Sequence, residues 1–285
     1  MDYKIIADSC CDLTEDMKSW SNLTMVPLTL QLGDYSIEDN ADFDQDDFIA
    51  RMDSFSGVPR SACPSPQAFA KAIEGPEKNV YLLTITDKLS GCYNSALQGK
   101  MLYEEEHPGE KNIHVFNSLA TSGLETIVAQ EIKRLADSGA PFDEIVEKVT
   151  DYISNHTALY FCLESLDALR NNGRLFSLAA TVIKKLKMKL ICHRSSEGTI
   201  GLSGQDFASK RALSKMCDMI CSDVEGIDLS DKKLIISHVC CPDKAEMIKS
   251  KISEKCAFGE IIILKASGLN SLYASNGGII VSYSK

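Results

Sequence analysis

Short apolar segments alternate with amphipathic stretches along the first half of the chain. Residues 5–7, 80–85 and 113–116 are short apolar runs, which is typical of buried strands. Apolar residues then recur at helical spacing from Leu124 to Leu135, and this pattern ends at Gly139. A second such pattern starts just after Pro141. The first half therefore predicts strand, polar loop and helix in repeated succession.

The second half mixes strands and helices less regularly. Its apolar runs predict strands at residues 159–162, 189–193, 234–238, 261–264 and 278–283, and its amphipathic stretches predict helices near 177–187, 208–222 and 243–255. The whole pattern predicts an α/β fold with two α/β domains. The first should hold a mainly parallel, Rossmann-like sheet and the second a mixed sheet.

The net charge also differs between the two halves of the chain. The 285 residues have a net charge of −10, of which residues 1–155 carry −15 and residues 156–285 carry +5. We therefore expect one domain over 1–155 and another over 156–285. A negative net charge argues against a nucleic-acid partner. The segment 170–211 nevertheless has a net charge of +7, which fits either a solvated face or a docking surface for an acidic partner.

The sequence also bears on the cellular compartment. No apolar run approaches the ~18 residues that a membrane span needs, and the N-terminal residues lack the pattern of a signal peptide. The 11 cysteines lack the spacing of a zinc site, so we interpret them as reduced structural thiols. We expect a cytoplasmic protein without a metal or cofactor.

Hydroxyl and amide side chains gather where the predicted strands of the first half end. Ligands of open α/β sheets bind at this edge. Ser90 and Gly91 precede one predicted helix, and Ser65 caps another beside Ser61. Such a set suits a small anion or a carboxyl group. The alternative is that each serine only caps its own helix.

An enzyme using Asp8 and Ser90, such as a phosphotransferase or a hydrolase, is a second hypothesis. The chain has no G-x-S-x-G elbow, no histidine in these loops and no phosphate-binding glycine loop, and these absences argue against it.

Seven short motifs, in order and with matching spacing, resemble the DegV family over essentially the whole chain. They are residues 8–13 (DSCCDL), 26–28 (VPL), 61–65 (SACPS), 89–96 (LSGCYNSA), 117–118 (NS), 169–174 (LRNNGR) and 277–278 (GG). The resemblance implies a bacterial lipid-binding protein of lipid metabolism that encloses one long-chain fatty acid between two domains. It also implies a partner, a separate ATP-dependent fatty acid kinase to which the carboxylate is presented.

The resemblance also implies site residues. Ser61 and Ser90 match the family's carboxylate contacts, and the surrounding head-group loops would contribute Gly91, Cys92, Ser9, Ser118 and Ala274. Cys92 stands where the family usually has threonine, and Ala274 stands where it usually has a histidine.

The basic segment would then dock the kinase. Arg170 and Arg174 lie in the shared LRNNGR turn, and Lys185 lies on a predicted helix where neighbouring lysines can share a face. A third hypothesis is an interaction protein that uses this basic surface and in which the lipid is only structural.

Overall fold

The computed structural model describes residues 2–175 and 188–285. Its N-terminal sheet is entirely parallel, in the order β2-β1-β6-β7. The strands are β1 (Tyr3–Asp8), β2 (Leu23–Val26), β6 (Asn79–Thr84) and β7 (Asn112–Asn117). The helices that accompany them are η1 (Met17–Ser19), α2 (Pro66–Ile73), α3 (Cys92–Glu106), α4 (Gly123–Asp137) and α5 (Phe142–Asn155).

Both faces of this sheet are covered because its strands are apolar on both sides. Ile6 and Leu82 pack towards α2 and α3, whereas their neighbours Ile5 and Leu83 pack towards α4 and α5. The helix α4 ends as the sequence predicts, with Gly139 just beyond it at φ +80°. These buried layers fix the strand ends from which the site loops emerge.

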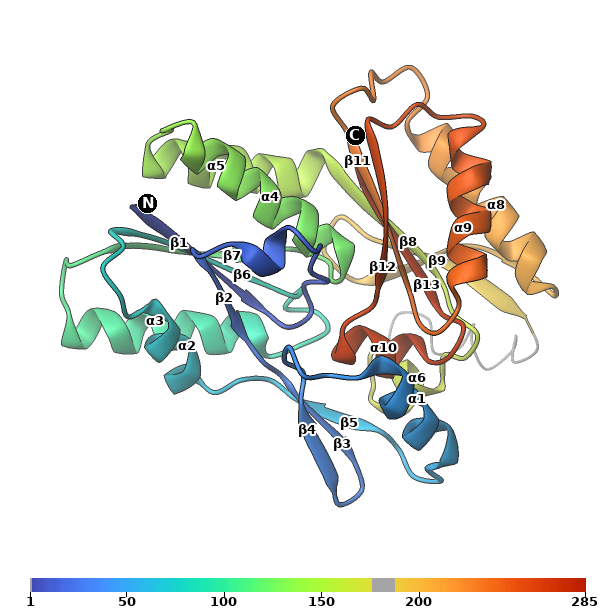
Figure 1. Ribbon diagram of the computed structural model, residues 1–285, viewed down its shortest axis with the longest axis horizontal. Coiled ribbons are helices and arrows are strands. Elements are labelled where there is room, and N and C mark those ends of the chain that lie inside the picture. The colour runs from blue at the N-terminus through green and yellow to red at the C-terminus, as the bar shows by residue number, and fades with distance from the viewer. Residues whose placement is uncertain (1, 176–187) are drawn as a thin grey trace.

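The C-terminal sheet is mixed, in the order β10-β9-β8-β13-β11-β12, and of its pairs only β11 with β12 is parallel. Its strands are β8 (Thr157–Cys162), β9 (Lys189–Arg194), β10 (Ile200–Asp206), β11 (Lys233–His238), β12 (Glu260–Lys265) and β13 (Ile279–Ser284). Its helices are α6 (Asp167–Asn171), α8 (Ser209–Asp223), α9 (Pro242–Ser253) and α10 (Gly268–Ala274). The helices α8 and α9 cover one face, and α4 packs against the other (Figure 1).

The helix α4 therefore lies between the two sheets and joins them. Gly123, at its first position, allows close contact, because a Cβ there would lie 2.6 Å from the Cγ2 atom of Ile235 in β11. A side chain at Gly123 would push the two sheets apart.

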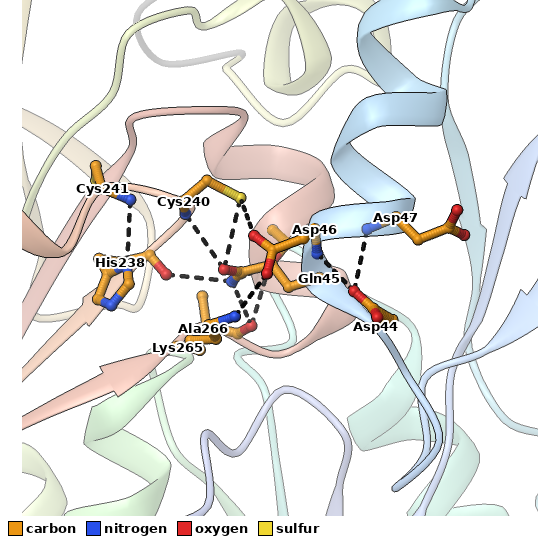
Figure 2. Close-up of polar contacts among 10 residues, drawn as sticks. Asp44, Gln45, Asp46, Asp47, His238, Cys240, Cys241, Lys265 and Ala266 are labelled. Carbon is orange, nitrogen blue, oxygen red and sulfur yellow. Dashed lines mark hydrogen bonds and ion pairs between the residues drawn. The ribbon is translucent and has the colours of Figure 1, made fainter.

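An arm connects the two halves at the bottom of the view, away from α4 (Figure 1). It contains a small antiparallel sheet of order β4-β3-β5 and one helix, with β3 (Thr29–Leu32), β4 (Tyr35–Glu38), α1 (Gln45–Ser54) and β5 (Arg60–Ala62). Figure 2 shows how its helix docks on the C-terminal half: Gln45 is buried and donates to the carbonyl oxygens of His238 and Ala266, at 3.2 and 2.9 Å. Cys240 N donates to the Gln45 side chain at 3.2 Å. These contacts fix the arm to the C-terminal half.

The structure confirms the predicted fold class, two α/β units with a parallel and a mixed sheet. The predicted threefold repeat of the first half is wrong in one respect, because the arm and β2 interrupt it. The predicted helix at 177–187 lies outside the described residues. The six-stranded sheet starts with β8 at Thr157, and the boundary after residue 155 stays a prediction. None of the helices in the described ranges is long and apolar enough to cross a membrane.

Candidate functional site

A largely apolar cavity lies between the strand-end loops of the N-terminal half and the C-terminal sheet. The centre of a water-sized sphere can occupy about 90 Å³ of this cavity. This is several times the ~10–15 Å³ that one water molecule needs. The apolar residues that line it are Ile85, Leu89, Leu119, Ala120, Leu159, Phe161, Leu163, Leu169, Ile200, Leu269, Ala274 and Ile280. Such a wall suits an apolar ligand.

The two serines predicted to hold a carboxylate both line this cavity. Ser61 lies in β5 of the arm and Ser90 in the loop between β6 and α3. The Ser90 hydroxyl donates to the Cys92 sulfur at 3.1 Å and accepts from Cys92 N at 3.3 Å. Two neighbouring segments, β5 and the loop between β6 and α3, therefore bring hydroxyl groups to one cavity.

Tyr273 adds a third hydroxyl that the sequence analysis did not predict. Its OH lies 3.1 Å from the Ser61 Oγ, and its side chain lines the cavity. The short helix α10 carries it, and Asp39 of the arm caps that helix by accepting from Gly268 N and Leu269 N at 2.7 and 2.8 Å. The arm therefore holds both Ser61 and the helix that presents Tyr273.

Arg174 brings a cation to the same end of the cavity. Its Nε donates to the carbonyl oxygen of Leu89 at 3.2 Å, its Nη1 to that of Asn172 at 2.5 Å, and its guanidinium carbon lies 5.8 Å from the centre of the Tyr273 ring. From the sequence, Arg174 was predicted to belong to a docking surface. The structure places it in the cavity wall.

The secondary head-group residues divide into two sets. Ala274 lines the cavity beside Tyr273. Ser9 accepts from Leu28 N at 3.0 Å, and Ser118 braces its own loop through Ala120 at 3.0 and 3.1 Å; both serines are buried. These two serines stabilise loops and are not among the cavity-lining residues.

The remaining predicted residues lie beside the cavity or on the surface. Gly91 and Cys92 adjoin Ser90 without lining the cavity, and burial raises the pKa of the Cys92 thiol, which stays protonated at neutral pH. Arg170 forms an exposed ion pair with Asp167 at 2.6 Å. Lys185 lies outside the described residues.

The tip of the β9–β10 hairpin closes the cavity from the C-terminal half. Gly198, at φ +80°, accepts at its carbonyl oxygen from the Thr86 hydroxyl at 3.1 Å. A Cβ at Gly198 would lie 2.4 Å from that hydroxyl oxygen and 3.1 Å from the backbone of Leu119. Only glycine allows the hairpin to approach these loops so closely.

Behind the strand ends lies a group of buried acids. Asp8 accepts from Cys10 N and Ile85 N, both at 3.0 Å, and one oxygen or sulfur atom from each of Asp8, Cys10 and Glu125 lies within 4.8 Å of the others. Burial, and then the neighbouring carboxylates of Asp8 and Asp12, raises the pKa of Glu125 well above its ordinary value. The raised pKa favours the protonated form of Glu125, and a protonated acid can lie beside the other acidic side chains without a bound metal ion.

Comparison with known proteins gives consistent matches over the full length. The model of the DegV family, described as uncharacterised proteins, matches residues 2–285. A DegV domain-containing protein of Streptococcus gordonii is 35% identical over 285 residues, which cover 99% of each chain.

Solved structures of similar proteins contain bound fatty acids. A DegV family protein from Ruminococcus gnavus, refined with vaccenic acid, is 36% identical with a TM-score of 0.92, and the match covers 99% of each chain. The Streptococcus pneumoniae fatty acid kinase B3 protein, loaded with linoleic acid, is 33% identical with a TM-score of 0.89 and covers 100% of this chain and 99% of that one. This chain belongs to the DegV family.

Proposed function

We propose that this protein binds one long-chain fatty acid and presents its carboxylate to a separate fatty acid kinase. The observation that carries the proposal is the cluster of Ser61, Ser90 and Tyr273 at one end of a largely apolar cavity. Similar proteins of the family hold fatty acids, and one is named as a fatty acid kinase protein. The protein would act in the cytoplasm as a carrier without a cofactor.

The cavity wall would supply the affinity and the hydroxyls the orientation. Each buried methylene contributes about 0.8 kcal/mol, so ~15 methylenes contribute on the order of 12 kcal/mol before ordering costs. Hydroxyl groups can donate to a carboxylate that lies against Ser61 and Ser90. Arg174 would lie near the same carboxylate, where its charge adds attraction.

The enzyme hypothesis receives less support from the geometry. The Asp8 carboxylate accepts from two backbone amides behind the loop, and the Ser90 hydroxyl donates to the sulfur of Cys92. A serine nucleophile needs a base within hydrogen-bond reach of its hydroxyl. Catalysis by a separate kinase therefore stays our proposal.

Native mass spectrometry of the purified protein, followed by solvent extraction, tests the function. We expect one bound fatty acid per chain. Ser61→Ala with Ser90→Ala should weaken binding by roughly 1.5–3 kcal/mol for each lost hydrogen bond, and Tyr273→Phe should weaken it as well. Ser36→Ala, at an exposed serine in β4 of the same arm, is the matched control. Binding by the double variant within a factor of two of wild type would contradict the assignment.

We also propose that Arg170, Arg174 and Lys185 dock the kinase. A change at Arg170 tests docking alone, because its exposed side chain lies outside the cavity lining. Arg174, in contrast, lines the cavity at the head-group end. Arg170→Glu should slow acyl-phosphate formation at low salt while fatty-acid affinity is unchanged. Equal losses in both assays would mean that the residue serves folding.

A further inference from the structure

The cavity has a second end, away from the head-group cluster, which we call the far end and define by Leu159, Arg194 and Ile200. The strand β8 runs between the two ends. It leads through Leu163 to α6 and the Arg174 turn, whereas its first residues lie beside the C-terminus, where Lys285 N donates to the carbonyl oxygen of His156 at 2.9 Å. The four steps along the strand from Leu159 to Leu163 span ~13 Å.

Strand pairing fixes Arg194 at this far end. Arg194 pairs with Ile200 on β10, and on its other side it follows His193, which pairs with Tyr160 of β8. It therefore stands beside Leu159 in the sheet. These residues are the lining residues farthest along β8 from the head-group cluster.

Three hydrogen bonds hold the Arg194 side chain in place. Its Nη1 donates to the carbonyl oxygen of Ile153 at 2.8 Å and to Thr157 Oγ1 at 3.3 Å, and its Nη2 donates to the carbonyl oxygen of Thr157 at 2.6 Å. The Ile153 carbonyl belongs to the last turn of α5, where a helix attracts cations. An arginine keeps its charge there although burial lowers its pKa.

We propose that Arg194 sets the longest acyl tail that this cavity accepts. The proposal rests on the fatty-acid function proposed above. A tail gains about fourfold in affinity for each methylene that it buries against the apolar wall. Once the terminal methyl group reaches Arg194, a further methylene must displace a guanidinium that holds three hydrogen bonds, so the gain stops.

A series of saturated fatty acids of increasing length tests the proposal on the delipidated full chain, by displacement of a fluorescent fatty acid. The wild type should gain about fourfold per methylene up to one length and nothing beyond it, and we call that length the break. Arg194→Met should move the break to longer acids and leave shorter acids within about twofold. Arg194→Lys, which keeps a cation at the end of α5, should also move it.

Two controls separate a length limit set by Arg194 from a general loss of fatty-acid binding. Arg174→Met makes the same change at the head-group end, and it should weaken acids of every length by one common factor without moving the break. Thr157→Val removes one acceptor while Arg194 stays, and the break should stay with it. If Arg194→Lys or Arg194→Met folds and shows the wild-type break, Arg194 does not set the limit. If the wild type binds no fatty acid of any length, the proposed function itself has failed.

Discussion

Replacing Glu125 with glutamine removes one buried acid and keeps almost the same shape. Glu125 lies in α4 with no exposed surface, and among the described residues neither of its carboxyl oxygens has a hydrogen-bond partner. Burial and the nearby carboxylates raise the pKa of this group well above its ordinary value of 4.5. The folded chain therefore keeps a proton on Glu125 at pH values where the unfolded chain has already released it.

The sign of the pH dependence follows from this raised pKa. Below the ordinary value both states are protonated and Glu125 costs nothing; as the pH rises towards the folded pKa, folding must take up a proton and stability falls. The slope for one proton is about 1.4 kcal/mol for every pH unit within that window. Glutamine does not titrate, so Glu125→Gln should gain stability over wild type by this amount per unit.

Urea unfolding at several pH values between 5 and 7 measures the effect. The difference in unfolding free energy between Glu125→Gln and wild type should grow steadily across the series. Glu147→Gln, at an exposed glutamate on α5, is the matched control for the same substitution at the surface. A constant difference for Glu125→Gln would mean that folding does not raise the pKa of Glu125, and the account of the buried acid group would be wrong.

Three further predictions concern the parts that hold the cavity together. Gly198→Ala should lower both the unfolding temperature and fatty-acid affinity, whereas Gly139→Ala, with the same φ of +80° but no described atom within 4 Å of its new methyl group, should affect only stability. Gln45→Leu should cost about 1–3 kcal/mol in urea unfolding, because it removes the buried side chain that donates to two carbonyl groups of the C-terminal half and accepts from Cys240 N; an unchanged midpoint would contradict this. Burial raises the pKa of Glu164, but hydrogen bonds from two lysines and a serine outweigh burial and hold this pKa at about 2. Glu164→Gln should therefore lose stability at neutral pH, and in thermal unfolding this loss should shrink as the pH falls from about 4.5 to about 2.

The fold was predictable where a strand is buried on both faces. The apolar run at residues 80–85 coincides closely with β6, and the helical spacing before Gly139 coincides with α4. The arm was not predictable in the same way. Its strands β3 (TLQL) and β4 (YSIE) do alternate, with Gln31 and Ser36 facing solvent, but each has only four residues, so the alternation is too short to stand out from the surrounding sequence.

The site was predictable where its residues lie in a short motif that resembles one of the family. It was not predictable where only tertiary contacts bring the residues together. Ser61 and Ser90 were found from the short motifs around them, and both line the cavity. Tyr273 has no such motif; it meets Ser61 only because Asp39 caps α10 from the arm. Arg194 was counted as part of a basic surface, because composition alone does not show that a charged side chain lies in a cavity wall.

The head-group end suggests why hydroxyls rather than a close ion pair would suit a carrier. A fatty acid that is to be phosphorylated must offer a carboxylate oxygen as the nucleophile, and a bidentate arginine pair would occupy both oxygens strongly. The Arg174 guanidinium already donates to the carbonyl oxygens of Leu89 and Asn172, which directs part of its hydrogen bonding away from the cavity. The hydroxyl groups of Ser61 and Tyr273 form a hydrogen bond with each other and can rotate, so either hydroxyl can turn towards a ligand and away again. The arrangement can therefore orient a carboxylate while leaving an oxygen free for transfer.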